Sequence, residues 1–323
     1  MQKYLKMVMF LIVINTTLLG FTLKKYGEFH FVKLHQNVYV MHGPVMAPNV
    51  ENEGFMNNPA IIEGDKGLIV IDPGGSYNVG KKVLAEIEKV SKKPILATIN
   101  THKHGDHWFA NKALLEKYPK LQIYAHTNMI HEVKAGEAEK WYGILDRLTH
   151  NLKGTDKAFA YPNHALKDGD EIVIESEKFR VFHPAKAHTD TDLIILHENS
   201  ETLFTGDNVM KGRMGAFDGS SSIFGNIETL EKLMKGKSYS YYVPGHGISG
   251  KKEETIKPYL HYLRVIGKWA QKAYDDDLES YEVKSAAIRE LQAYKNWDGF
   301  SYTVGRHLSK AYEEIEMREV AGE

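Results

Sequence analysis

Residues that could carry chemistry are concentrated in one short segment of the sequence. The run "THKHGDH" places His102, His104, Asp106 and His107 within six positions. Imidazole nitrogens and carboxylate oxygens are ligands that zinc accepts in proteins. In an extended chain, side chains two positions apart point to the same side, so His102 and His104 can bind one ion together. The glycine that follows permits a turn, after which Asp106 and His107 can face a second ion. The segment therefore predicts two adjacent metal half-sites.

Three further residues of ligand type stand beside expected strands. An open catalytic zinc site uses about three protein ligands plus water, so each half-site needs ligands from elsewhere in the chain. His188 precedes the apolar run "LIIL", Asp207 follows "LFTG" and His246 follows "YYVPG". One such residue alone usually belongs to a turn or a surface loop. Because ligand types recur at successive strand ends, the sequence predicts that these three residues complete the metal sites.

Expected strands and helices alternate around these ligands. The β-branched runs on both sides of Asp65-Lys66-Gly67 predict a hairpin, and the apolar spacing of residues 78–93 predicts a helix. Two β-rich halves that each carry helices predict two packed sheets flanked by helices. Further strands are expected at 29–34, 37–43, 94–100, 121–126, 170–176, 178–185, 192–199, 202–209 and 239–247, and further helices at 108–118, 127–150 and 226–234.

Residues 29–250 resemble the metallo-β-lactamase-fold hydrolases. "THKHGDH" matches the T-H-x-H-x-D-H signature of this family in full, and "LIVIDPGG", "HTDTD", "TGDNV" and "PGHG" are similar to its other site segments. The resemblance implies an α/β fold, a four-layer αββα sandwich, with two zinc ions per chain. The ligands that it implies are His102, His104 and His188 for one zinc, Asp106, His107 and His246 for the other, and Asp207 as the bridge between them.

The resemblance also implies a function. A hydroxide that bridges the two zinc ions would cleave an acyl bond in an ester, thioester, lactone or β-lactam, and Asp106 would be the catalytic group that moves the proton. Asp72 would orient the histidine segment, and a turn-forming Asp-Pro pair is the alternative for this residue. Three alternatives stay open: a mononuclear iron persulfide dioxygenase, a dedicated β-lactamase and a non-catalytic binding protein.

Two details place the chain within this family. An aspartate at position 207 is similar to glyoxalase II-like members, whereas zinc β-lactamases of two subclasses have a cysteine there. The N-terminal part of the chain, through "INTHKHGDHWFAN", is most similar to an exported subgroup associated with sulfur-oxidation and quinoprotein systems. These details favour a hydrolase other than the cysteine-containing β-lactamases.

Substrate contacts are expected near the second half of the site. Lys211 and Arg213 follow the bridging aspartate and could bind a substrate carboxylate, although solvated loop cations are the alternative. Asn226 could line the pocket, or it could cap the helix that is expected at 226–234. The loop 43–58 offers an apolar flap made of Met46, Phe55 and Met56.

The N-terminal segment has the pattern of a secretory signal. Lys3 and Lys6 precede an apolar run over residues 7–14, which is too short for a comfortable membrane span. We therefore expect a signal peptide at 1–22 and a periplasmic or secreted protein. An uncleaved N-terminus would then be its only contact with a membrane.

The net charge and the amino-acid composition limit the classes of partner that we expect. The formal net charge of −1 gives no overall basic field, which predicts no nucleic-acid partner. The small-molecule substrate that we expect follows from the resemblance to the hydrolases. The absence of cysteine excludes disulfides and thiolate ligands. We expect a catalytic domain at 23–250 and a helical extension at 251–323 that packs on the domain, covers the pocket or forms a homodimer.

Overall fold

The computed structural model describes residues 29–155 and 159–322. The signal peptide expected at 1–22 lies outside this part of the chain. None of the helices in these two ranges combines the length and the apolar character that a membrane span requires.

The first β-sheet contains seven strands, which follow one another in the order of the chain. Strands β1 to β4 are antiparallel neighbours, whereas β4 to β7 run parallel. Strand β4 is buried throughout, as its unbroken apolar run LIVI requires in a sheet that is covered on both faces. The predicted hairpin across Asp65-Lys66-Gly67 is confirmed by β3 and β4. The strands are β1 Val32–His35, β2 Val38–Val40, β3 Ala60–Glu63, β4 Leu68–Ile71, β5 Ile95–Ile99, β6 Gln122–His126 and β7 His164–Leu166.

The second β-sheet contains five strands in the order β12-β11-β10-β9-β8. Strands β8 to β11 are antiparallel neighbours, and β11 runs parallel to β12. In β9, buried Phe179 and Val181 alternate with exposed Lys178 and Arg180, so that one face of this strand packs on the core. The strands are β8 Glu171–Ile174, β9 Glu177–Phe182, β10 Ile194–His197, β11 Thr202–Met210 and β12 Tyr241–His246.

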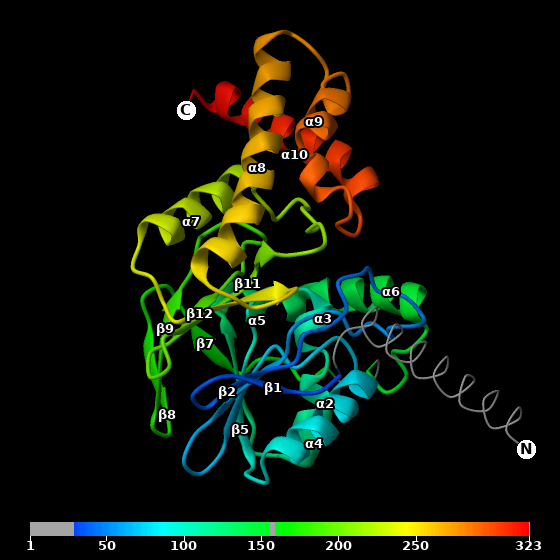
Figure 1. The fold of residues 1–323 in the computed structure, drawn as a ribbon. Helices are drawn as coiled ribbons and strands as arrows, with labels where there is room; N and C mark the ends of the chain where they lie inside the picture. The colour runs from blue at the N-terminus through cyan, green and yellow to red at the C-terminus, as the bar shows by residue number, and fades with distance from the viewer. Residues whose placement is uncertain (1–28, 156–158, 323) are drawn as a thin grey trace, which may run out of the picture.

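The two sheets pack face to face, and helices cover their outer faces (Figure 1). Apolar side chains of β4, β5, β9 and β10 meet in the core between the sheets. Helices α2 (Tyr77–Val90) and α4 (Asn111–Lys117) pack on the outer face of the first sheet. Helix α7 (Ile223–Lys235) packs on the second sheet. This arrangement confirms the predicted four-layer αββα sandwich. The remaining helices of this part are α3 Gly105–Trp108, α5 Thr127–Glu132, the π-helix η1 Val133–Glu137 and α6 Ala138–Thr149.

The C-terminal part of the chain is helical and gathers at one end of the molecule (Figure 1). Its helices share one buried cluster with the second sheet, in which Leu203 and Tyr242 of the sheet meet Leu263 and Val304 of the extension. The extension therefore packs on the second sheet through a common hydrophobic core. Its helices are α8 Lys252–Asp275, α9 Lys284–Glu290, the 3-10 helix η2 Gln292–Tyr294 and α10 Phe300–Ala321.

Helix α7 corrects one expectation from the sequence. It begins at Ile223, and Ser222 is its N-cap, because the Ser222 hydroxyl accepts a hydrogen bond from the Gly225 amide at 2.9 Å. The prediction that Asn226 caps this helix is therefore wrong. Serine is as good a capping residue as asparagine, and a cap at Ser222 adds Ile223 to the buried face of the helix.

Candidate metal centre

Parallel strand pairs bring the predicted ligands to one end of both sheets. Asp72 follows β4, and the segment 101–107 follows its parallel neighbour β5. In the second sheet, Asp207 lies within β11 and His246 ends the parallel neighbour β12. His188 lies in the connection between β9 and β10. The segment 101–107 and His246 thus lie at the carboxyl ends of parallel strands, and Asp207 inside β11 and His188 in the loop between two antiparallel strands join them there.

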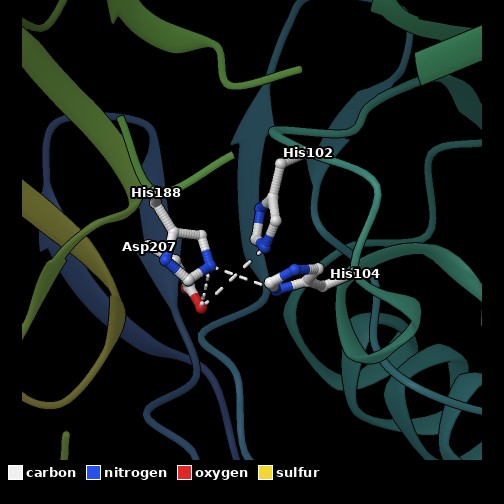
Figure 2. Close-up of side chains that lie close together, drawn as sticks. All are labelled: His102, His104, His188 and Asp207. Atoms are coloured by element: carbon white, nitrogen blue, oxygen red, sulfur yellow. Dashed lines mark hydrogen bonds and ion pairs between the residues drawn. The ribbon is translucent and has the colours of Figure 1, made fainter. Parts of the chain in front are cut away.

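The first group of ligands consists of His102, His104, His188 and Asp207. All four residues are buried, and their ligand atoms lie within 4.8 Å of one another. The Nε2 atom of His188 is 3.1 Å from Nδ1 of His104 and 3.5 Å from Oδ2 of Asp207. The Nε2 atom of His102 is 3.8 Å from the same oxygen. Figure 2 shows the three imidazole rings and the carboxylate pointing toward one another.

The second group consists of Asp106, His107 and His246, which are also buried. The Oδ2 atom of Asp106 is 3.4 Å from the Nε2 atoms of both histidines. Asp207 contacts this group as well, because its Oδ1 is 3.2 Å from Nε2 of His107 and its Oδ2 is 3.2 Å from Nε2 of His246. The Asp207 carboxylate thus lies between the two groups and contacts both.

These distances match the spacing of ligands around shared ions. Two ligands that bind zinc at 2.0–2.1 Å in a tetrahedral site lie roughly 3.3 Å apart, and the separations here range from 3.1 to 3.8 Å. In the described part of the chain, the buried Nε2 atoms of His102 and His107 and the Oδ1 atom of Asp207 have no hydrogen-bond partner. A buried polar atom without a partner costs free energy. The converging lone pairs therefore favour a bound cation, and the residues fit a divalent metal.

Asp72 fixes the orientation of two ligand rings. The Thr101 hydroxyl donates to Oδ2 of Asp72 at 2.6 Å, so it accepts a hydrogen bond from Nδ1 of His102 at 3.0 Å. Nδ1 of His107 donates to the same Asp72 oxygen at 2.8 Å. In both rings the Nε2 lone pair is therefore left facing the site. Asp72 also has a φ of 47°, in the left-handed region, and directly precedes Pro73.

Strand β12 holds its ligand through the backbone of a distant loop. Nδ1 of His246 donates to the Met56 carbonyl at 2.7 Å, which leaves its Nε2 lone pair toward the site. The residue before it is Gly245, where an added Cβ would collide with Oδ1 of Asp207. Glycine therefore allows β12 to approach the bridging carboxylate closely.

Burial keeps the first group of histidines neutral. It holds the pKa of His102 and His104 well below the usual range and lowers the pKa of His188 to about 4. These imidazoles are neutral near pH 7 and have a lone pair available for a cation.

The second group contains ionised carboxylates. Burial would raise the pKa of Asp106 and Asp207, but the neighbouring imidazoles of His107 and His246 hold both well below their usual range. Burial alone would lower the pKa of His107, but Asp207, Asp106 and Asp72 raise it well above its usual value. Without a cation the proton on this ring balances part of the carboxylate charge, and a divalent cation bound to Nε2 would take the place of that proton.

A cavity of about 350 Å³ opens onto both ligand groups. Of the predicted substrate contacts, Arg213 lines this cavity, and its Nη1 atom lies 3.5 Å from Nδ1 of His246. Lys211 and Asn226 are not among its lining residues. The Lys211 amide donates to the His246 carbonyl at 3.1 Å, and Asn226 is buried within α7. The structure therefore gives no support for substrate contacts from Lys211 or Asn226.

The loop 43–58 reaches the cavity through only part of its predicted flap. Met56 lines the cavity, and the Met46 carbonyl accepts a hydrogen bond from Arg213 at 3.4 Å. Phe55 instead packs against Phe29, with ring centroids 5.0 Å apart, inside the core beside α2. Of the predicted flap, the Met56 side chain and the Met46 backbone therefore lie near the ligands, whereas Phe55 does not.

Several residues that line the cavity were not predicted from the sequence, among them Trp141, Tyr302, Arg306 and His307. Trp141 of α6 lies beside a ligand, because its ring centroid is 4.2 Å from that of His104. Tyr302, Arg306 and His307 also line the cavity. They belong to α10, which lies more than 50 positions after the last ligand, His246. None of them stands at a strand end, which was the pattern that identified the ligands. The sequence predicted a helix at 127–150, but nothing in that prediction points toward the site.

Comparisons with known proteins agree on the family. Residues 52–246 match the sequence model of the family described as the metallo-beta-lactamase superfamily. The chain is 40% identical over 77 residues to a linear primary-alkylsulfatase of a Pseudomonas species, a match that covers 23% of this chain and 15% of the relative. It is 25% identical over 185 residues to a hydroxyacylglutathione hydrolase of Francisella tularensis subsp. novicida, which covers 57% of this chain and 60% of the relative. The chain thus spans 60% or less of the length of either relative.

A solved structure extends the likeness of fold into the helical extension. A double mutant of a secondary alkyl sulfatase aligns with a TM-score of 0.67 and 15% sequence identity, over 88% of this chain and 50% of that chain. The matched 88% of the chain is a larger share than residues 1–246 make up. The match therefore includes part of the helical segment that follows His246.

Proposed function

The chain belongs to the metallo-beta-lactamase superfamily, and from this premise we propose that it is a metal-dependent hydrolase with two zinc ions. In this proposal His102, His104 and His188 hold one ion, and Asp106, His107 and His246 hold the other. Asp207 bridges them.

The position of Asp207 is the observation that carries the proposal. Its Oδ1 lies 3.2 Å from a histidine of the second group, and its Oδ2 lies within 3.2 to 3.8 Å of histidines from both groups. A mononuclear iron centre, as in the persulfide dioxygenase alternative, would leave the buried group of Asp106, His107 and His246 without a cation. The completeness of both groups therefore supports two metal ions.

The reaction that we propose is hydrolysis of an acyl bond. Two zinc ions held in this site would supply Lewis acidity for the scissile carbonyl and make water acidic enough to react near neutral pH. Asp106 lines the cavity as an ionised carboxylate and accepts a proton from the attacking water. The water oxygen bonds to the acyl carbon, the bond from that carbon to the leaving oxygen or sulfur breaks, and the proton passes from Asp106 to the leaving atom.

An ester or thioester is the first candidate for the substrate. The hydroxyacylglutathione hydrolase relative, which matches over 57% of this chain, supports this choice. A sulfate ester is the second candidate. It is supported by the identity of 40% over 77 residues with the primary-alkylsulfatase and by the likeness of fold to the secondary alkyl sulfatase, which includes part of the helices after residue 246.

Metal analysis combined with a hydrolysis panel tests this proposal. We expect two zinc ions per chain and release of thiol or alcohol from thioesters, esters or lactones, with loss of turnover after chelation and recovery with zinc. β-Lactams belong in the panel because a dedicated β-lactamase would hydrolyse them faster than any other class. Hydrolysis of alkyl sulfates alone would favour the second candidate. One iron ion per chain together with oxidation of persulfides would contradict the hydrolase.

A further inference from the structure

Arg213 has hydrogen-bond donors that the protein does not use. Its buried Nε atom has no acceptor in the described part of the chain. Its Nη1 atom lies 3.2 Å from the sulfur of Met56, a weak acceptor, 3.4 Å from the carbonyl of Met46 and 3.5 Å from Nδ1 of His246. Because Nδ1 of His246 already donates its hydrogen to the Met56 carbonyl, it cannot accept one from Arg213. A guanidinium with unused donors beside the metal ligands favours an anionic partner.

Trp141 adds a second unused donor to the same cavity. Its buried indole Nε1 also has no acceptor among the described residues. Among the described residues that line the cavity, and apart from the metal ligands, the buried side-chain atoms without a partner are this N–H and the Arg213 Nε–H. Both donors belong to lining residues and lack the acceptor that an anionic ligand would supply.

Helix α10 supplies another cation to the mouth of the cavity. Arg306 lines the cavity, is exposed to solvent and forms no ion pair with a carboxylate among the residues that the structure describes. Its Cζ atom lies 5.9 Å from the ring centroid of Tyr302, which lines the cavity as well. The part of the cavity wall formed by α10, here called the outer wall, therefore also carries an arginine without an acidic partner in the described chain, as the part beside the ligands does with Arg213.

The two arginines belong to segments that are joined to each other. Nε2 of His307 donates to the Gly215 carbonyl at 3.0 Å, and Nδ1 of His307 accepts from the Tyr262 hydroxyl at 2.8 Å. The Met214 amide donates to the Asp298 carbonyl at 2.9 Å. The loop that carries Arg213 is therefore hydrogen bonded to the segments that begin and contain α10.

An apolar strip leads away from the ligands on another side of the cavity. Trp141, Ile144 and Leu148 line the cavity from α6, and their spacing of three and four residues places them on one face of this helix. Trp141 contacts His104 at one end of the strip. Leu148 is 40% exposed at the other end, although it is a large apolar side chain. Such a strip suits an alkyl chain.

We propose that α10 is a substrate-recognition element, in which Arg306 and Arg213 hold the anionic group of an amphiphilic substrate while its alkyl part lies along Trp141, Ile144 and Leu148. This inference rests on the proposed hydrolase, whose substrate class it narrows. The anionic group is a carboxylate or a sulfate, since both accept hydrogen bonds from a guanidinium fork.

Binding measurements on the zinc-loaded full chain test this inference separately from catalysis. The probes are octyl sulfate and octanoate, with octanamide as the neutral partner of the same chain length, and the readout is calorimetry. The variant is Arg306→Gln, and the matched control is Lys310→Gln, which removes a cation one turn further along α10 that does not line the cavity. A repeat with metal-free protein separates binding by arginine from binding by zinc.

We expect the wild-type chain to bind both anions more tightly than octanamide. Arg306→Gln should weaken the binding of both anions by about fivefold to tenfold, in the zinc-loaded and the metal-free chain, and change octanamide binding by less than about twofold. Lys310→Gln should leave all three affinities unchanged. Equal affinity for anions and octanamide, or equal losses in the two variants, would overturn the inference. Failure of the chain to hydrolyse any ester, thioester or sulfate would contradict the proposed function while this binding pattern could still hold.

Discussion

The inner and outer parts of the cavity are built in contrasting ways. The ligands inside are almost completely buried, and the rings of His102, His107 and His246 are held by hydrogen bonds to Thr101, Asp72 and Met56. In the outer wall His307 is held by two hydrogen bonds, whereas Tyr302 is 57% exposed and the exposed Arg306 has no acidic partner in the described chain. If the proposed function holds, the chemistry is fixed by geometry in the interior, whereas recognition would be left to side chains that can adjust to a ligand.

The largest effect should come from removing the residue that connects the two ligand groups. We expect Asp207→Ala to lower turnover by roughly a thousandfold or more, because two cations without their bridging carboxylate repel each other and lose a shared ligand. Metal analysis should show loss of zinc from both groups, and circular dichroism should show the fold retained. Asp276→Ala, which removes an exposed carboxylate at the end of α8, serves as the control. Two tightly bound zinc ions and full activity in Asp207→Ala would show that Asp207 is not a bridge.

A smaller change tests whether the inner geometry is as rigid as the comparison requires. Gly245→Ala keeps every ligand but places a methyl group against Oδ1 of Asp207. We expect zinc affinity to fall by roughly a hundredfold or more, which is the upper range for changes that displace a metal ligand indirectly. Gly219→Ala is the matched control, because a Cβ there meets nothing within 4 Å. Equal zinc affinity in the two variants would mean that the interior relaxes easily.

Removing the support behind the ligands should have an intermediate effect. Asp72→Asn keeps the size of the side chain but removes the charge that accepts hydrogen bonds from Thr101 and His107. We expect metal affinity to fall by about tenfold to a hundredfold, with the ligands themselves intact. Competition with a chromogenic chelator measures this change. An unchanged affinity would assign Asp72 to the turn alone.

The smallest effect is expected at a histidine outside both parts of the cavity. Burial and then the stacked ring of His183 lower the pKa of His126 to about 4. The folded protein thus favours the neutral ring, so stability is fully present above the unfolded pKa of about 6.5 and is lost as the pH falls toward 4. His126→Asn retains an acceptor for the Asn128 amide, which His126 caps at 3.3 Å. We expect the variant to lose less stability than wild type between pH 6.5 and 4, by on the order of 1 kcal/mol. Urea unfolding across this pH range measures the difference, and parallel curves would exclude His126 as the cause.

The sequence predicted the interior of the site far better than its outer wall. The cluster from His102 to His107 is local, and zinc accepts few side chains, so residue types and strand ends were sufficient to name seven residues that the structure brings together. The same strand patterns predicted the two sheets. The short strand β7, with only three residues, was missed because its pairing with β6 stabilises it more than its own composition does.

The outer wall depends on contacts that no local pattern reports. Arg306 and Tyr302 reach the cavity because α8 and α10 pack on the second sheet, and that packing decides which turn of α10 faces the ligands. The error at Asn226 has a related cause. Several residues near it can cap a helix, and burial of Ile223 decides in favour of Ser222.

Asp298 joins the start of α10 to two distant loops, and these contacts bear on the order in which the molecule folds. Its carboxylate accepts a hydrogen bond from the Ala47 amide across 251 positions of the chain, and its backbone pairs with the segment around Arg213. Closing such long loops costs entropy before any contact compensates for it, so these contacts should form late in folding and open first. In native-state hydrogen exchange, the amides of Met214 and Asp298 should therefore exchange through smaller openings than those of β4 and β5. The wall that receives the substrate would then be the part of the protein that opens without unfolding the rest.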